Sequence, residues 1–463
     1  MELLRLEGTR AALLGLRDVP DLHVVGPSAV DRGDGTWFVS AYAPDGGADS
    51  LRARGLTVRA LKSAADLRGV QAAAVGGYLT AAEIAERVRA LAAAHPAVCA
   101  VETLPQRTHE GREVLALRIG SGQAGRLIAL GGVHAREWAP PDALVSLAEG
   151  LVRAHATGGA LEHPEHRDGA VVYGAWSVPA DTVRRIAEEL TLHVVALVNP
   201  DGRDFSLAAP NDEHRMWRKN RRPAAAGDTG PWCDGVDLNR NFDLAWDFER
   251  YYNEAAALEV RSSKQPCDPE IFIGPGAASE PETANVQALV ERVRPSHFID
   301  VHSYARTILF PWGMDDDQGR DPTQSHRNPD WDRDGRHGGR DGAGGVYGEF
   351  LAGDVAAAHQ AAGRRMRDAI RDQAGADPTA RRRSLYTVKQ ALGLYPTTGT
   401  SDDWCLGHGA PVLAYCLECG IDQAPGDPAD DDGGFHPDHR RQFPKIEREV
   451  HAAVLALAQT ALP

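Results

Sequence analysis

Continuous apolar segments alternate with helix-like segments along most of this chain, and this alternation constrains the fold more than any other feature. The apolar segments predict strands at residues 114–119, 127–133, 192–198, 297–302 and 411–417. Two segments have the periodicity of amphipathic helices, at residues 141–154 and 445–462. Strands that are apolar on both sides need cover on both faces. We therefore expect an α/β fold with a central sheet between layers of helices.

A small N-terminal unit is predicted at residues 1–76, ahead of a large domain at residues 77–463. Two short strands are expected in it, at residues 36–42 and 56–61. The large domain should open with a helix at Thr80, because Thr80 and Glu83 have the spacing of a capping box, and this helix should stop before Pro96. A chain of 463 residues exceeds the size at which one core usually stops growing, which favours two units.

Two segments of the large domain have the composition of inserted surface loops, near residues 315–345 and 423–440. The second contains the acidic stretch 427–432 and is expected to be solvated. Within the first, residues 330–341 repeat the opening of a calcium-binding loop. They lack the usual closing glutamate, so a plain solvated loop is the alternative.

The charge balance restricts the partners of the chain. Fifty basic and 65 acidic side chains give a net charge of -15. This charge disfavours nucleic acid and anionic membrane surfaces, and it is compatible with cationic peptides as substrates. No apolar run approaches the roughly 18 residues of a membrane span, and the first residues show no secretory signal.

Side chains able to bind a metal follow the predicted strands. His134 and Glu137 come just after residues 127–133, three residues apart, so that one turn can point both side chains the same way. His302 ends the strand predicted at 297–302. Two imidazoles and one carboxylate are zinc ligands that leave a position for water, as in hydrolytic sites. A His-x-x-Glu pair alone also occurs on solvated helix faces, so the metal site depends on the three residues meeting at one edge of the sheet.

Four further motifs extend this pattern. They are Asn-Pro-Asp-Gly at 199–202, Arg-Met-Trp-Arg-Lys at 215–219, Gly-Val-Asp-Leu-Asn-Arg-Asn at 235–241 and Tyr-Pro-Thr-Thr-Gly-Thr-Ser-Asp-Asp-Trp at 395–404. Together with the candidate ligands and Glu418, their order resembles that of the zinc metallocarboxypeptidases of the carboxypeptidase A/B type. The resemblance covers roughly residues 77–460. We expect an α/β fold with a mixed central sheet sandwiched by helices, and a small N-terminal α+β or β-rich unit.

The resemblance implies roles for the catalytic residues. His134, Glu137 and His302 would bind one zinc ion per chain, and Glu418 would be the general base and proton shuttle. Arg218 matches the arginine that stabilises the oxyanion, although a basic run of this kind is usually solvated.

It also implies residues that position the ligands and the substrate. Asn239 and Arg240 match the clamp for the terminal carboxylate of the substrate, and Tyr395 matches a mobile tyrosine that closes over the bound residue. Arg136 matches an arginine of an outer subsite. Asp237 matches a carboxylate that orients His134. Asp300, two residues before His302, is a second candidate for such support, at the end of its own strand.

Specificity should depend on Asp402, which falls where the family places the base of the side-chain pocket. An aspartate there pairs with Lys or Arg, because a buried carboxylate needs a cation. A shift of one residue would give this role to Asp403.

The resemblance implies a disulfide between Cys233 and Cys267, and such a bond indicates an oxidising, extracellular compartment. The lack of a visible signal peptide points the other way. Cys416 and Cys419 flank Glu418 on a predicted strand, where their side chains should diverge, and we interpret both as packing residues. The N-terminal unit occupies the place of an inhibitory propeptide, and an accessory domain is the alternative.

The predicted function is zinc-dependent hydrolysis of the C-terminal peptide bond of peptides and proteins, with acceptance of C-terminal Lys or Arg. One alternative is cleavage of cell-wall peptides that end in an amino-bearing residue such as diaminopimelate. Another is an inactive binding module with the same fold, which the presence of Glu418 and all three ligands disfavours. The sequence leaves the oligomeric state and the physiological substrate open.

Overall fold

The computed structural model describes most of the 463 residues. The residues left out are 20–21, 45, 64–75, 210–211, 253–259, 315–321, 323–324, 326–348, 394, 409–411 and 425–426. The calcium loop predicted at 330–341, and nearly all of the loop predicted near 315–345, lie outside the described residues.

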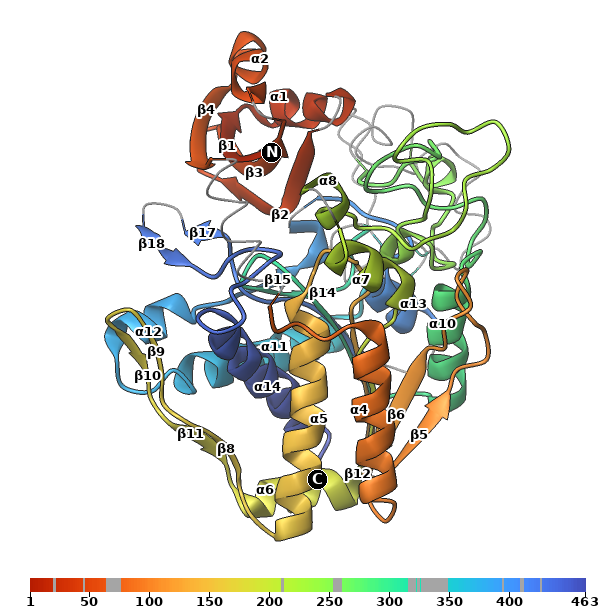
Figure 1. Ribbon diagram of the computed structural model, residues 1–463, viewed down its shortest axis with the longest axis vertical. Coiled ribbons are helices and arrows are strands. Elements are labelled where there is room, and N and C mark those ends of the chain that lie inside the picture. Colours follow the sequence, from red (N-terminus) through yellow and green to blue (C-terminus); the bar gives the residue numbers. More distant parts are fainter. Residues whose placement is uncertain are drawn as a thin grey trace.

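An eight-stranded mixed sheet forms the centre of the large domain, with the strand order β15-β14-β16-β13-β7-β12-β6-β5 (Figure 1). Its strands are β5 Cys99–Thr103, β6 Leu115–Ile119, β7 Gly125–Gly131, β12 Leu190–Val195, β13 His297–His302, β14 Thr307–Phe310, β15 Thr387–Gln390 and β16 Leu413–Glu418. β12, β7, β13 and β16 run parallel to one another, whereas β6 and β14 are antiparallel to their neighbours β12 and β16. The prediction of an α/β fold with a mixed central sheet is confirmed.

Helices lie on both faces of this sheet. They are α4 Ala81–Ala94, α5 Ala139–Thr157, α6 Ala180–Glu189, α7 Pro200–Leu207, α8 Asp212–Arg215, α10 Pro281–Val293, α11 Gly353–Asp372, α12 Pro378–Arg383, α13 Ser401–Gly407 and α14 Phe443–Thr460. α4 begins with the predicted capping box: the Thr80 amide donates to Glu83 Oε2 at 2.8 Å, and the Glu83 amide donates to Thr80 Oγ1 at 3.3 Å. Among the described helices, none has both the length and the apolar content needed to cross a bilayer.

The remaining elements are short and lie around this core. They are the 3-10 turns η2 Leu238–Arg240, η3 Phe248–Arg250 and η4 Ala391–Gly393, and the strands β8 Leu161–His163, β9 His166–Asp168, β10 Val171–Tyr173, β11 Trp176–Val178, β17 Gln423–Ala424 and β18 Asp427–Asp431.

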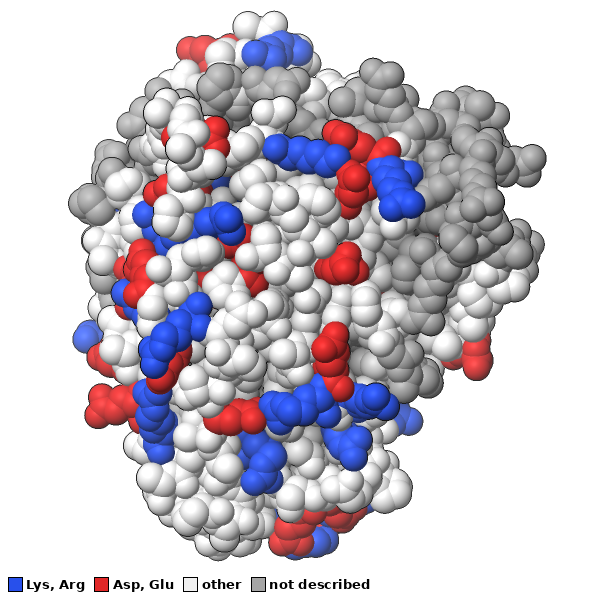
Figure 2. Space-filling model, turned by 90° about the vertical axis from the view of Figure 1, so that its right-hand side faces the viewer, with Lys and Arg blue, Asp and Glu red and all other residues white. Residues whose placement is uncertain are grey.

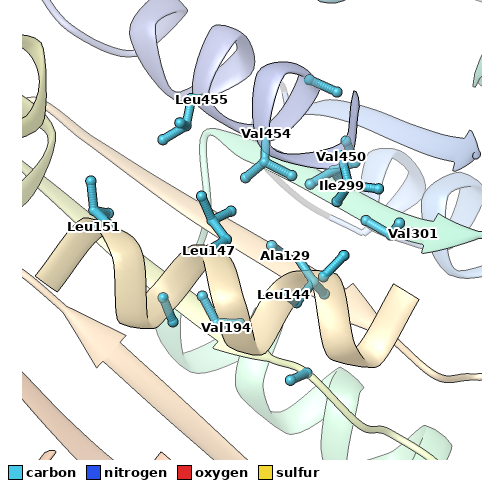
Figure 3. Close-up of a cluster of buried hydrophobic side chains, with 14 of the residues drawn as sticks. Ala129, Leu144, Leu147, Leu151, Val194, Ile299, Val301, Val450, Val454 and Leu455 are labelled. Carbon is cyan, nitrogen blue, oxygen red and sulfur yellow. The ribbon is translucent and has the colours of Figure 1, made fainter. Parts of the chain in front are cut away.

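Alternate residues of the central strands belong to two different cores. In β7, Leu127 and Ala129 pack with helices α4, α5, α11 and α14, while Ile128 and Leu130 pack with α10 and α13 on the other face. Figure 3 shows the first of these cores, with Leu147 of α5 and Val454 of α14 above the same face of the sheet. Because both sides of each strand are buried, the strands read as continuous apolar segments in the sequence.

The N-terminal unit is an antiparallel four-stranded sheet with the order β2-β3-β1-β4. Its elements are β1 Glu2–Gly8, α1 Arg10–Leu14, η1 Gly15–Asp18, β2 His23–Asp31, β3 Trp37–Ala43, α2 Gly47–Ala53 and β4 Thr57–Lys62. Leu4 and Leu6 of β1 face a core within the unit, whereas Leu3 and Tyr42 belong to a cluster with Tyr304 of the large domain. The unit therefore buries one sheet face internally and the other against the large domain (Figure 1).

The acidic stretch 427–432 is not the solvated loop that we predicted. It contains β18, and its Asp430 and Asp432 are 3% and 4% exposed. Arg306 donates to both carboxylates at 2.6–3.0 Å, and Lys445 lies 2.8 Å from Asp432. These cations are distant in the sequence, so the local acidic composition gave no sign of them.

On the face in Figure 2, acidic and basic side chains are interspersed, so the net negative charge does not form one patch there.

We predict that acidification destabilises the fold through buried histidines, with His297 at the start of β13 as the test residue. Its ring nitrogens lie 2.8 Å from Ser296 Oγ and 3.0 Å from Thr460 Oγ1, and burial, with a smaller contribution from His359, lowers the pKa of His297 to about 4. In the unfolded chain, where the pKa of His297 is about 6.5, the imidazole takes up a proton at a higher pH than in the folded chain. Stability that is present above about pH 6.5 is therefore lost as the pH falls toward 4.

This group alone should lower the free energy of unfolding by about 2 kcal/mol between pH 7 and pH 5. Denaturant unfolding curves at both pH values, for the parent protein and for His297→Gln, measure the effect. Equal losses in the two proteins would show that His297 does not contribute.

Candidate active site and metal centre

Three side chains from two strand ends meet at one edge of the central sheet. His134 and Glu137 lie in the turn between β7 and α5, and His302 is the last residue of β13. Glu137 Oε1 lies 2.7 Å from His134 Nδ1, Glu137 Oε2 lies 3.0 Å from His302 Nδ1, and the two Nδ1 atoms are 3.0 Å apart. All three side chains are buried. Two imidazole nitrogens and a carboxylate converging in this way fit the donor set of a zinc ion.

The backbone around this group fixes its position. Gly132 has φ +64°, and a Cβ there would come within 2.7 Å of Leu197 Cδ1, so only glycine fits this tight turn after β7. The Ser303 amide donates to Glu137 Oε2 at 3.1 Å. Burial opposes the charge of Glu137, but His134 and His302 outweigh it and lower the pKa of Glu137.

Each imidazole also has a carboxylate partner of its own. His134 Nε2 lies 3.2 Å from Asp237 Oδ1, and His302 Nε2 lies 3.1 Å from Asp300 Oδ2. Asp237 is further held by Arg218, and Asp300 by the Ser401 hydroxyl at 2.6 Å. The two carboxylates leave both Nδ1 atoms facing the shared point, the arrangement that orients metal-binding histidines.

Glu418 and Arg218 lie beside the three candidate ligands. Glu418 ends β16 and is paired in register with His302. Burial, with repulsion from Glu137, raises the pKa of Glu418 to about 7. Its Oε2 accepts no hydrogen bond within the part of the chain that the structure describes. Arg218 Nη1 lies 4.0 Å from Glu137 Oε1, and Arg218 and Glu418 line the same cleft.

His134, Glu137, Arg218 and Glu418 line one cleft at this edge of the sheet. The cleft also contains the substrate-binding residues predicted from the sequence: Arg136, Asn239, Arg240, Tyr395 and Asp402. Arg240 Nη1 donates to the Asn239 carbonyl at 2.6 Å, and Asn239 Oδ1 accepts from the Ser401 amide at 2.8 Å. Arg136 is paired with Glu270 at 2.7 Å. The structure therefore brings together all the predicted site residues that belong to the large domain, apart from the two half-cystines.

Asp402 and Asp403 have different surroundings. Asp402 lines the cleft, and its Oδ2 accepts no hydrogen bond from the described residues, although the side chain is only 2% exposed. Burial raises the pKa of Asp402. Asp403 instead accepts hydrogen bonds from the Gly313 and Met314 amides at 2.9–3.2 Å. Of these two aspartates, only Asp402 lines the cleft and leaves a carboxylate oxygen without a hydrogen bond from the described residues.

The cysteines divide into a bonded pair and four thiols. Cys233 and Cys267 form a disulfide. Cys419 packs in the large core, in line with the interpretation as a packing residue. Cys416 also packs, against Leu309, but it forms part of the cleft wall as well.

Sequence reasoning missed several residues of the cleft. Cys416 could have been found, because it lies two residues before Glu418 on a strand and so shares its face. Glu270 and Arg261, which form an ion pair at 3.5 Å, come from a loop without periodicity. Val24 and Val25 of the N-terminal unit also line the cleft, and no local signal in the sequence indicates that contact.

The chain is similar in sequence to known carboxypeptidases. A family model described as zinc carboxypeptidase matches residues 84–452. Carboxypeptidase B of Astacus astacus is 26% identical over 343 residues, which cover 73% of this chain and 84% of that protein. An inactive metallocarboxypeptidase, ecm14, of Talaromyces stipitatus is 27% identical over 219 residues, which cover 44% of this chain and 30% of that protein.

The fold is also known from solved structures. The crystal structure of thrombin activatable fibrinolysis inhibitor matches with a TM-score of 0.68 and 18% identity, over 99% of this chain and 98% of that chain. At this identity the likeness concerns the fold alone.

We predict that the purified protein binds one zinc ion per chain and that His302→Ala loses it, because two remaining ligands hold zinc weakly. Metal analysis after dialysis against zinc-containing and then zinc-free buffer measures this. His155→Gln, a change at a partly exposed histidine near Glu188, is the matched control and should keep the full zinc content. Full zinc content in His302→Ala would contradict the assignment.

Proposed function

We propose that this chain, which belongs to the zinc carboxypeptidase family, hydrolyses the C-terminal peptide bond of peptides and proteins and accepts Lys or Arg at that position. One observation carries the proposal. A single cleft is lined by His134 and Glu137 of the His-Glu-His group, by Glu418 and by Asp402, and each of the last two has one buried carboxylate oxygen without a hydrogen bond from the described residues. The His-Glu-His group and Glu418 supply hydrolytic chemistry, and Asp402 supplies selectivity.

The hydrolytic step needs a base and a group that stabilises negative charge. His134, Glu137 and His302 would hold a zinc ion, which would supply Lewis acidity toward water and the scissile carbonyl group. Glu418 takes the proton of the attacking water and returns it to the leaving amine, for which a pKa near neutral is suitable. Arg218 is held by Asp237 and stabilises the oxyanion as it develops.

The same cleft holds the end of the substrate. Arg240 and Asn239 donate to its terminal carboxylate, because a guanidinium can meet both oxygens at once. Tyr395, with Arg261 5.9 Å from the centre of its ring, lies at the same cleft and closes over the bound residue. This clamp limits cleavage to the last peptide bond, because only the C-terminal residue carries a free α-carboxylate next to that bond.

Asp402 supports a preference for basic residues. Its carboxylate is buried, lines the cleft and has no hydrogen bond to Oδ2 from the described residues. A Lys or Arg side chain would pair with it, whereas an apolar side chain would leave it unpaired at a cost of several kcal/mol.

We predict that peptides ending in Lys or Arg are cleaved with a higher kcat/KM than peptides ending in Phe or Leu. Asp402→Asn should lower kcat/KM for the basic peptides by about 30-fold or more, equivalent to about 2 kcal/mol, because it leaves their cation unpaired. Peptides ending in Leu serve as the internal control and should change little. A peptide ending in diaminopimelate should be included, and a clear preference for it would favour a cell-wall substrate instead.

We predict that Glu418→Gln lowers kcat by about 10²–10⁴-fold, the usual contribution of a general base, while zinc content stays at one per chain. Steady-state kinetics and metal analysis on the same preparation measure both. Full turnover in Glu418→Gln would contradict the mechanism. No turnover in the parent protein with zinc bound would favour an inactive binding module, as in the relative named inactive.

The N-terminal unit, proposed to span residues 1–76, acts as an inhibitory lid. Val24 and Val25 line the cleft, and His23 Nδ1 lies 3.4 Å from Glu270 Oε1, beside Arg136. Lys62, at the end of β4, lies 2.6 Å from Asp422 and 3.0 Å from Asp431 of the large domain. Val24 and Val25 thus form part of the cleft wall, and the ion pairs of Lys62 attach the unit to the large domain.

We predict that Lys62→Glu raises the rate of peptide hydrolysis by about tenfold or more, because losing a buried ion pair costs about 3–5 kcal/mol and weakens the attachment of the lid. Arg59→Glu changes an exposed residue of the same strand in the same way and is the control. Equal rates in the two variants would argue against the lid.

A further inference from the structure

One thiol of this chain reaches the cleft. Cys416 lies on β16, lines the cleft and is 7% exposed. Its Sγ donates to Glu418 Oε1 at 4.0 Å, and its side chain packs against Leu309. A group attached to this sulfur would therefore lie beside the glutamate that we propose as the general base.

The other cysteines are not accessible from the cleft. All six cysteines are among the described residues, and two of them form the Cys233–Cys267 disulfide. Cys99, Cys405 and Cys419 are at most 2% exposed and pack within the two large cores. A reagent that enters the cleft thus meets a single thiol.

A second acidic side chain besides Glu418 lines the same cleft as this thiol. Asp402 is 2% exposed, lines the same cleft, and its Oδ2 accepts no hydrogen bond from the described part of the chain. Burial, together with the charges of Glu418, Asp402 and Asp300, raises the pKa of Cys416. The same negative charges repel anions and attract cations.

We propose that Cys416 is a site of reversible covalent modification by small thiol-reactive compounds that carry a positive charge, such as the disulfides and thiosulfonates of aminothiols. The inference rests on the proposed substrate pocket. The ammonium group of such a compound takes the place of a Lys side chain near Asp402, and its sulfur comes within reach of Cys416. Ordinary negatively charged thiol reagents lack this attraction.

The chemical step is an exchange at sulfur. With an alkyl methanethiosulfonate, Cys416 Sγ–H gives its proton to solvent, and the thiolate attacks the sulfur that carries the alkyl group. The new S–S bond forms as the bond to the sulfonyl sulfur breaks, and methanesulfinate leaves. A thiol reductant reverses the modification by the same kind of exchange. The attached aminoethyl group then fills the pocket between Asp402 and Glu418 and blocks substrate.

The test compares two reagents of similar size and opposite charge on the full-length protein, 2-aminoethyl and 2-sulfonatoethyl methanethiosulfonate. Intact mass and peptide mapping report the modified residue, and peptide hydrolysis is followed in parallel. We expect one adduct, on Cys416, to form about tenfold faster with the cationic reagent, equivalent to about 1.4 kcal/mol of attraction. Turnover should fall with the extent of modification and return after a short reductant pulse, with unmodified protein given the same pulse as control.

Two variants separate the contributions. Cys416→Ser should form no adduct and lose none of its own starting activity to the reagent, with Cys416→Ala as a second variant if serine disturbs folding. Asp402→Asn should still be modified but lose most of the difference between the two reagents. Adducts on other cysteines, equal rates for both reagents in the parent protein, or full turnover after complete modification would each overturn the proposal. Mass spectrometry measures the modification of Cys416 directly. It therefore tests this proposal even if the parent protein hydrolyses no peptide and the proposed function is wrong.

Discussion

The convergence of buried charged side chains at the carboxyl ends of β7, β13 and β16 is the constraint on which the rest of this molecule depends. Three parallel strands in one register bring His134, His302 and Glu418 to the same edge, although more than a hundred residues separate each from the next along the chain. Burying so many charged groups costs several kcal/mol for each one that stays unpaired. The structure meets this cost for the two histidines with Asp237 and Asp300, and a zinc ion would meet it for Glu137.

Buried polar atoms that lack a hydrogen bond in this cleft therefore indicate where another molecule would bind. Among the described residues of the cleft, the Oε2 atom of Glu418 and the Oδ2 atom of Asp402 accept no hydrogen bond, and each is buried. In a fold where buried carboxylates such as Asp403, Asp430 and Asp432 are held by two or more donors, these two atoms are left for other molecules. Glu418 is paired in register with His302, and Asp402 lines the same cleft. The same argument gives significance to Cys416, which lies in the cleft with both.

How much of this was predictable depends on the range of the interactions. Local sequence patterns predicted four central strands and three helices, namely β7, β12, β13, β16, α4, α5 and α14. A strand buried on both faces is a continuous apolar segment, and a helix buried on one face has apolar residues at helical spacing. The strands β14 and β15 were missed, because each has only four residues, and β15 also lies at the edge of the sheet with β14 as its one neighbour. The acidic stretch 427–432 was misjudged for a related reason, since its partners Arg306 and Lys445 lie elsewhere in the chain. The sequence could have placed Cys416 in the cleft, because Cys416 lies two residues before Glu418 on one strand and shares its face. We interpreted it as a packing residue alone.

The sequence by itself determined the class of fold, the family resemblance and the identity of the candidate site residues, because these depend on local periodicity and on motifs of fixed order. Only the tertiary structure decided which of two adjacent aspartates faces the cleft, that Asp237 and Asp300 each hold a different histidine, and that the N-terminal unit reaches the cleft with Val24 and Val25. A shift of one residue in a loop, or the placement of one unit on another, leaves the local pattern unchanged. Loop register and the placement of one unit on another are fixed by contacts between distant residues, and those contacts exist only once the chain has folded.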